Sequence, residues 1–315
     1  MGVMTSVVTG GAGFIGSHLV DALLAAGHKV IAVDNLLTGS EQNLSEAKKN
    51  SNFSFIREDI IQQAPVVTDQ VDYVFNLASP ASPVDFKKLS EEIALVNSIG
   101  TGHMLRFAVD HHARFLEAST SEIYGEPKEH PQKETYWGNV NPNGVRSCYD
   151  ESKRFAEALV MIYVRKYNLD ARIIRIFNTY GPRMQKDDGR VVSNFINQAI
   201  VGAPLTVYGD GTQTRSFTYV SDLVDGIMKV MVADDLQGEV FNLGNPDEHS
   251  VKELAQKVKA LTGSNSEIVS APLPEDDPTR RKPDSSKVSA AVGWKPVVSL
   301  EEGLKKTIGF YKRTS

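Results

Sequence analysis

A tyrosine and a lysine four residues apart are the side chains of this sequence whose types and spacing could do chemistry. Tyr149 and Lys153 fall at the start of a run of good helix formers, 151–167, that contains neither glycine nor proline. Residues at i and i+4 share a helix face, so the Lys153 ammonium is expected beside the Tyr149 phenol. A neighbouring cation favours phenolate and lowers a tyrosine pKa from about 10 toward neutrality. The pair could therefore remove a proton from a sugar hydroxyl.

A second match to this spacing, Tyr124 and Lys128, is interpreted as a turn. Gly125 and Pro127 lie between the two residues and disfavour the helix that would bring their side chains together. The spacing therefore predicts proximity only for the first pair.

The elements that would position the pair alternate between strands and helices from residue 6 to residue 178. The sequence predicts strands at 6–9, 29–33, 53–56, 71–78, 114–118 and 171–177. It predicts helices at 17–26, 91–112 and 151–167. Parallel strands need crossover helices between them, so this order predicts an α/β fold, a doubly wound (Rossmann) parallel sheet.

The turn after the first strand has a glycine at every third position: Gly10, Gly13 and Gly16. Such a turn lets the backbone approach a pyrophosphate at the positive end of the next helix. The second strand ends in Asp34, which can accept from both ribose hydroxyls and would repel a 2′-phosphate. This pattern predicts NAD rather than NADP. The other residues predicted to bind the cofactor are Phe14, Ile15, Asn35, Thr38, Gly39, Asp59, Ile60, Leu77, Ala78, Ser79, Asn97, Tyr149 and Lys153.

Three loops at predicted strand ends carry further polar candidates. Asp59, after the third strand, could meet the adenine or be an ordinary solvated carboxylate. The fourth strand runs into 79–83, where two prolines predict a rigid loop at the edge of the sheet where ligands bind. The fifth strand leads to 119–125, whose hydroxyls and carboxylate could hydrogen-bond a sugar or form an ordinary cap and turn.

Composition excludes several classes of function. The net charge of -5 and the lack of a long basic run argue against nucleic-acid or membrane-surface binding. The single cysteine, Cys148, excludes an internal disulfide and fits a reducing compartment; no adjacent histidine would activate it as a nucleophile. No apolar run approaches 18 residues, so we expect a cytoplasmic protein with no membrane span. His103, His111 and His112 lack further ligands at metal-binding spacing, and no metal is predicted.

The second half of the chain predicts a smaller lobe interleaved with the first. Helices are expected at 191–201, 221–232, 251–261 and 300–311, and strands at 205–208, 240–243 and near Ile268; residues 217–220 lead into the helix at 221–232. Residues 1–179 and 217–244 are assigned to the NAD-binding Rossmann domain, and 180–216 and 245–315 to a substrate-binding lobe. Arginines in its loops could converge on a nucleotide diphosphate: Arg183, Arg190, Arg215, Arg280 and Arg281.

The helix at 151–167 is apolar over most of its circumference. One face should cover the sheet, and the other also needs burial. This pattern predicts a homodimer formed through helices 91–112 and 151–167.

In their order, the glycine turn, the 119–125 segment and the Tyr149/Lys153 pair resemble the extended short-chain dehydrogenase/reductases that act on nucleotide sugars. The runs 130–142, 144–151, 175–184, 188–195 and 281–284 are similar to those of the UDP-glucuronate decarboxylases, also called UDP-xylose synthases. The resemblance implies that bound NAD⁺ oxidises C4 of UDP-glucuronate, that the β-keto acid loses CO₂, and that hydride return gives UDP-xylose.

The resemblance also implies roles for individual residues. Tyr149 would be the base, Lys153 would lower its pKa and hold the nicotinamide ribose, and Thr120 would hydrogen-bond at the C4 oxygen. Glu122 would orient either the sugar or a water for protonation at C5. The positions that would bind the UDP-sugar are Pro80, Ser82, Glu122, Tyr149, Asn178, Arg183, Arg190, Val191, Tyr208, Arg215 and Arg281.

Two positions separate this sequence from related activities. Ser121 stands where a sugar 4,6-dehydratase would carry an aspartate, and a 4-epimerase normally lacks the carboxylate of Glu122. Phe86 stands where the decarboxylases usually have a tyrosine. The alternatives are a UDP-sugar 4-epimerase and a non-catalytic NAD-binding scaffold.

Overall fold

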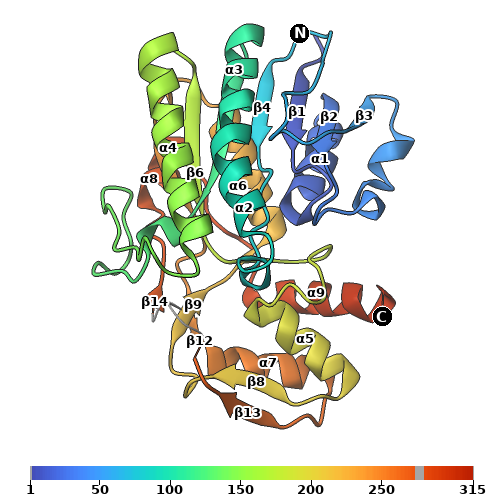
Figure 1. The fold of residues 1–315 in the computed structure, drawn as a ribbon. Helices are drawn as coiled ribbons and strands as arrows, with labels where there is room; N and C mark the ends of the chain where they lie inside the picture. The colour runs from blue at the N-terminus through green and yellow to red at the C-terminus, as the bar shows by residue number, and fades with distance from the viewer. Residues whose placement is uncertain (1, 274–279, 315) are drawn as a thin grey trace.

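A seven-stranded parallel sheet forms the centre of the molecule in the computed structural model, which describes residues 2–273 and 280–314 (Figure 1). Its strand order is β11 (Val240–Leu243), β6 (Ala171–Ile176), β5 (Arg114–Thr120), β4 (Tyr73–Asn76), β1 (Thr5–Thr9), β2 (Lys29–Asp34) and β3 (Phe53–Arg57). Every neighbouring pair is parallel. The predicted doubly wound sheet is confirmed.

Helices cover both faces of this sheet. One face packs against α3 (Thr101–His111) and α4 (Ser147–Tyr167), and the other against α1 (Phe14–Ala25) and α6 (Val220–Val232). Alternate strand residues pack against the two helix layers: Val7 faces the α3–α4 side, and Val8 faces the α1–α6 side. Strands buried on both faces read as continuous apolar runs, which is why β1 and β2 were recognisable from sequence.

The sheet has its topological switch point at β1. The chain passes from β1 to β2 and β3 on one side, and then returns to β4 and β5 on the other. Loops leaving the carboxyl ends of β1 and β4 therefore diverge and leave a crevice between them.

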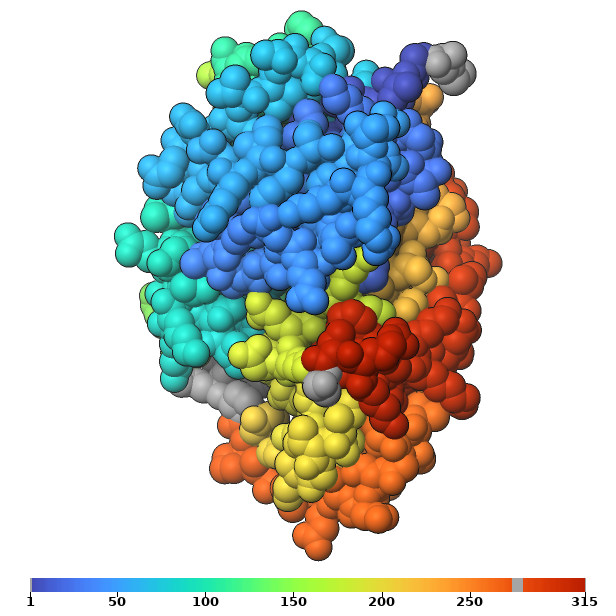
Figure 2. Space-filling view, turned by 90° about the vertical axis from the view of Figure 1, so that its right-hand side faces the viewer, coloured from blue at the N-terminus to red at the C-terminus, as the bar shows by residue number. Residues whose placement is uncertain are grey.

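A smaller group of elements lies beyond the carboxyl ends of the strands (Figure 1). It contains α5 (Val191–Val201), α7 (Val251–Thr262) and α9 (Leu300–Thr314), with β8 (Leu205–Tyr208) paired to β13 (Ile268–Ala271). In Figure 2 the red end of α9 lies beside the yellow segment of α5, between the blue N-terminal residues and the orange α7 region.

Several short elements were not predicted from the sequence. They are β7 (Thr179–Tyr180), paired with β10 (Thr218–Tyr219); the sheet of β12 (Glu248–Ser250), β9 (Thr214–Ser216) and β14 (Arg280–Arg281); and α8 (Ser286–Val292). Strands of two or three residues are too short to show a period in the sequence. The division into two domains stays a prediction, and Met1, 274–279 and Ser315 within it lie outside the described residues. Helix α8, within the predicted second lobe, packs on β11 and α6.

The predicted helix 91–112 is divided in the structure. Helix α2 (Ser90–Leu95) is followed by a π-helical turn (Val96–Gly100) and then by α3. Gly100 has low helix propensity and packs so closely that a Cβ there would lie 3.0 Å from Ile60. Helix α4 begins at Ser147, four residues before the predicted start.

Within residues 2–273 and 280–314, none of the helices has the length and apolarity needed to cross a bilayer. The same residues contain no group of three or more His, Cys, Asp or Glu side chains arranged to hold a metal ion.

Candidate active site

A cavity of about 700 Å³ opens at the carboxyl ends of the sheet strands. Its walls come from the loops after β1, β2, β4, β5 and β6, together with α4, the 183–192 segment and α9. The crevice at the switch point of the sheet forms one half. The smaller group of elements closes the other half.

The glycine turn shapes the end of the cavity near β1. Gly10 has φ +68°, and a Cβ there would lie 2.9 Å from the Leu77 backbone. A Cβ on Gly16 would lie 2.1 Å from the Gly10 carbonyl oxygen, so only glycine allows this close approach of helix and turn. The first turn of α1 carries no acidic residue, and its positive N-terminal end faces the cavity. This is a suitable cradle for a pyrophosphate.

Asp34 ends β2 at the same edge of the sheet. Its Oδ2 accepts from the Ala12 N–H at 3.0 Å and its Oδ1 from the Leu36 N–H at 2.8 Å. Burial raises the pKa of Asp34, and these two hydrogen bonds partly offset that rise. A Cβ on Gly39 would lie 2.9 Å from Asp34 Oδ1, so the glycine leaves the carboxylate accessible to a ribose. The residues present fit a dinucleotide without a 2′-phosphate.

All the residues predicted to bind the cofactor line the cavity except Asn97. Asn97 lies in the π-helical turn, 1% exposed, and its Nδ2 donates to Ser79 Oγ at 3.1 Å and to Ser152 Oγ at 3.0 Å. It therefore supports the Ser79 loop from behind rather than lining the site. Asp59 lines the cavity but is also held by the loop backbone, since its Oδ1 accepts from the Ile61 N–H at 2.9 Å.

Tyr149 and Lys153 occupy one face of the first turns of α4, and both line the cavity. Burial raises the pKa of Tyr149 to about 12, although a hydrogen bond with Thr120 and the charge of Arg190 both lower it. The prediction that Lys153 would bring this pKa toward neutrality is wrong for the protein by itself. The Lys153 ammonium donates to the Ala118 carbonyl at 2.7 Å and to Glu117 Oε1 at 3.3 Å, and burial of the phenol outweighs the lowering effects.

The 119–125 segment forms the expected cap and turn and also contributes to the cavity wall, while hydrogen bonding to a sugar stays a prediction. Thr120 ends β5, and its Oγ1 accepts from the Glu122 N–H at 3.2 Å, which starts a 3₁₀ turn (Ser121–Tyr124). Thr120 and Glu122 both line the cavity.

Glu122 is held between two arginines. Its Oε2 lies 2.6 Å from Arg146 Nη2, and its Oε1 lies 3.2 Å from Arg281 Nη1. Burial would raise the pKa of Glu122, but Arg281 and Arg146 outweigh it and hold the pKa at about 2. Glu122 is therefore a carboxylate at neutral pH and can only accept hydrogen bonds.

The arginines predicted to bind the substrate differ in their surroundings. Arg183 pairs with Asp21 of α1 at 2.7 Å, and Arg190 pairs with Asp188 at 2.5 Å. Arg280 is exposed and does not line the cavity, unlike its neighbour in β14. The other predicted substrate-binding positions all line it: Pro80, Ser82, Glu122, Tyr149, Asn178, Arg183, Arg190, Val191, Tyr208, Arg215 and Arg281.

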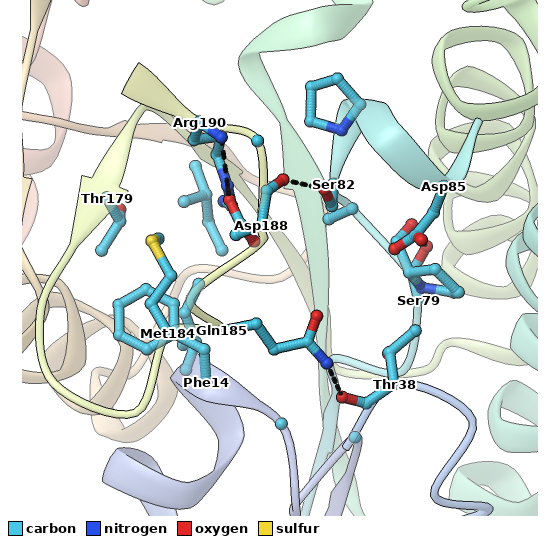
Figure 3. A pocket seen from close by; sticks show the side chains of 18 of the residues that line it. Phe14, Thr38, Ser79, Ser82, Asp85, Thr179, Met184, Gln185, Asp188 and Arg190 are labelled. Atoms are coloured by element: carbon cyan, nitrogen blue, oxygen red, sulfur yellow. Dashed lines mark hydrogen bonds and ion pairs between the residues drawn. The ribbon is translucent and has the colours of Figure 1, made fainter. Parts of the chain in front are cut away.

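The 183–190 segment crosses the cavity and joins its two halves (Figure 3). Gln185 Nε2 donates to the Thr38 carbonyl at 2.6 Å, and Ser82 Oγ donates to the Asp188 carbonyl. On the other side, the Tyr311 hydroxyl of α9 donates to the Met184 carbonyl at 2.9 Å. These contacts join positions distant in sequence, so no local pattern could have predicted them.

Arg146 and Asp150, in or beside the site, were not predicted from the sequence, and Phe86 was noted there without a role. Phe86 stacks on Tyr149 with ring centroids 5.3 Å apart, and Arg146 lies 5.4 Å from the Phe86 ring centroid. Asp150 is 5% exposed; burial and the charge of Glu122 raise its pKa to about 8. Arg146 could have been found from sequence, since it lies one helical turn before Tyr149.

A glycine turn, an aspartate at the end of β2 and a buried tyrosine–lysine pair line one cavity above a parallel sheet, as in an extended short-chain dehydrogenase/reductase. A family model described as GDP-mannose 4,6 dehydratase matches residues 7–307. UDP-glucuronic acid decarboxylase 4 of Arabidopsis thaliana is 54% identical over 96% of this chain and 67% of its own. UDP-glucuronic acid decarboxylase 1 of Danio rerio is 49% identical over 98% of this chain and 72% of its own.

A solved structure has a similar fold. UDP-glucuronic acid 4-epimerase from Bacillus cereus, in complex with UDP-glucuronic acid and NAD, superposes with a TM-score of 0.89. It is 30% identical and covers 99% of this chain and 100% of its own. The chain belongs to the UDP-glucuronic acid decarboxylase family. It is an enzyme, and NAD is its cofactor.

Proposed function

We propose that this enzyme converts UDP-glucuronate to UDP-xylose through a 4-keto intermediate and regenerates NAD⁺ in each turnover. The observation that carries the proposal is Glu122, an arginine-held carboxylate that lines the same cavity as Tyr149 and Thr120. The decarboxylase names of the relatives support the same activity.

Tyr149 is the proposed base for the C4 hydroxyl. Thr120, its hydrogen-bond partner, would also bond to the C4 oxygen and hold it toward the phenol. Bound NAD would supply a hydride acceptor at C4 and, later, the hydride that returns. Because the protein alone keeps the Tyr149 pKa near 12, the positive charge of the oxidised cofactor would add to the lowering effect of Arg190.

Loss of CO₂ needs little covalent help once C4 is a ketone. The C5–C6 bond breaks, its electrons enter the enolate of the ketone, and C5 then takes a proton. Glu122 is ionised at neutral pH, so it cannot give that proton itself. It would instead accept a hydrogen bond from a sugar hydroxyl or from the water that protonates C5.

The UDP group would bind among the arginines at the opposite wall. Arg190, Arg215 and Arg281 offer planar donors that suit phosphate and carboxylate oxygens. Asp188 accepts from Nε and Nη2 of Arg190, and the guanidinium has further N–H donors that could contact the UDP group.

Incubation with UDP-glucuronate labelled with ¹³C at C6, followed by carbon and proton NMR, tests this function. Labelled CO₂ or bicarbonate with a UDP-pentose spectrum is expected, and the C4 proton couplings identify xylose. Retention of the label in a C4-inverted sugar would establish a 4-epimerase instead. An unchanged sugar that still binds would leave a non-catalytic scaffold.

We further propose a homodimer formed through α2–α3 and α4. Its support is the exposed apolar surface of these helices: Phe155 is 51% exposed, Ile162 43% and Ile99 46%. Phe155 and Ile162 are seven residues apart and share one helix face. Phe155→Glu should give a monomer by light scattering, whereas Val297→Glu, at an 82% exposed valine elsewhere, should not. A dimer that survives Phe155→Glu would exclude this face.

A cytoplasmic location is also proposed. It rests on the single cysteine, Cys148, which fits a reducing compartment. Microscopy of a fluorescent fusion in the source cells checks it, and a signal confined to membranes or secreted material would refute it.

A further inference from the structure

A fully buried carboxylate lies behind the catalytic lysine. Glu117 in β5 is 0% exposed, and its Oε1 lies 3.3 Å from Lys153 Nζ. Its Oε2 accepts from Asn76 Nδ2 at 2.7 Å. Lys153 lines the cavity and Glu117 does not, so the lysine is held from the side away from the ligand. Neither the sequence motifs nor the proposed mechanism gave this carboxylate a role.

The surroundings of Glu117 hold it in one position. Asn76 in β4 is fixed in turn by Thr9 Oγ1, which donates to its Oδ1 at 2.8 Å. The other charged groups nearby are Glu157 of α4 and Arg175 of β6, which form their own ion pair at 2.8 Å. Lys153 is therefore the cation that compensates Glu117.

We propose that Glu117 is a positioning residue that holds Lys153 against β5, offsets its positive charge, and so determines how readily Tyr149 gives up its proton. The inference rests on the proposed role of Tyr149 as the base. It adds a second layer to the site, in which a carboxylate acts on the phenol through the lysine.

Two contacts favour an ionised Glu117, and burial opposes them. Burial raises the pKa of Glu117, and the charge of Lys153 and the Asn76 hydrogen bond oppose the rise. An ionised Glu117 partly cancels the field of Lys153 at the phenol, which disfavours phenolate. The charged groups that act on Tyr149 are Glu122, Arg190 and Asp150, of which Glu122 and Arg190 line the cavity.

Glu117→Gln removes the charge while it keeps the shape and an acceptor for Lys153. The glutamine amide would meet the Asn76 amide, and Asn76 is kept from rotating because Thr9 Oγ1 donates to its oxygen and already accepts from the Leu77 and Ala78 N–H groups. Circular dichroism and thermal melting of each variant therefore establish its fold before the titration. Glu117→Asp is the matched control because it retains the charge and changes only the length.

The measurement is a pH-jump titration of tyrosinate by ultraviolet absorbance, with and without NAD⁺, read before the protein unfolds. Ten tyrosines contribute, so the same variants carrying Tyr149→Phe are subtracted. Glu117→Gln should ionise Tyr149 at a pH lower by about one unit. Glu117→Asp should follow the wild type. The acid limb of kcat/KM should move in the same direction.

An unchanged Tyr149 midpoint in Glu117→Gln would overturn the inference, and so would equal shifts in the Gln and Asp variants, which would indicate a packing effect. The titration does not depend on turnover. A wild-type protein that leaves labelled UDP-glucuronate intact would refute the proposed function, while the titration would still decide the role of Glu117.

Discussion

Replacing Glu122 by glutamine should lower the stability of the protein and also slow decarboxylation. The change removes the carboxylate that pairs with Arg146 and with Arg281, which is 2% exposed. The fall of the Glu122 pKa from 4.5 to about 2 corresponds to about 3 kcal/mol at roughly 1.4 kcal/mol per pH unit. The loss of one partner from a buried pair costs about 3–5 kcal/mol, which is the same order.

The pH dependence of this loss has a definite sign. A carboxyl whose pKa is lowered by folding contributes stability that is fully present above its unfolded pKa and disappears as pH falls through the folded pKa. The difference between wild type and Glu122→Gln should therefore be constant above about pH 4.5 and shrink toward pH 2.

Urea unfolding at several pH values measures this difference. Glu301→Gln is the control, because Glu301 forms an exposed ion pair with Lys305 on α9 and should lose nothing measurable. The labelled decarboxylation assay on the same preparations should show a larger loss in rate than in UDP binding. If Glu122→Gln is as stable as Glu301→Gln at neutral pH, the two arginines do not depend on Glu122 and the reasoning is wrong.

Three further outcomes are expected. Tyr149→Phe should abolish turnover while the protein still binds NAD by calorimetry, since the stacked Phe86 ring keeps its partner; wild-type turnover would remove Tyr149 from the mechanism. Asp34→Ser should reduce the preference for NAD over NADP at least about tenfold in binding assays, because the charge that repels a 2′-phosphate is lost; an unchanged ratio would contradict the assignment of Asp34. Gly16→Ala should prevent NAD binding, because the new Cβ would lie 2.1 Å from the Gly10 carbonyl oxygen; normal affinity would show that the turn can relax.

Much of the cofactor half could be predicted from the sequence. Gly10, Gly13 and Gly16 mark a turn whose conformation depends on local sterics, and Asp34 follows them at the end of the next apolar strand. The Tyr149/Lys153 pair could also be predicted from local sequence, since helix geometry alone places both residues on one face of α4. Helix α5 and strand β8 also have the predicted bounds, because their patterns are bordered by clear turn residues.

The surroundings of Asn97 and the pKa of Tyr149 could not be predicted from local sequence, and cofactor binding by Asn97 stays a prediction. Asn97 lies in the π-helical turn within the predicted helix, and its amide contacts Ser79 and Ser152 instead of lining the cavity. The Tyr149 pKa depends on burial, which the spacing of two residues does not report.

The sequence by itself determined the fold class, the dinucleotide turn and the tyrosine–lysine pair, because each depends on residues within a few positions of one another or on the period of apolar residues. Only the tertiary structure decided the charge state of the site. Glu122 meets Arg281 and Lys153 meets Glu117 across long stretches of chain. Burial and the distance between charges set their energies, and both exist only after the strands and helices have packed.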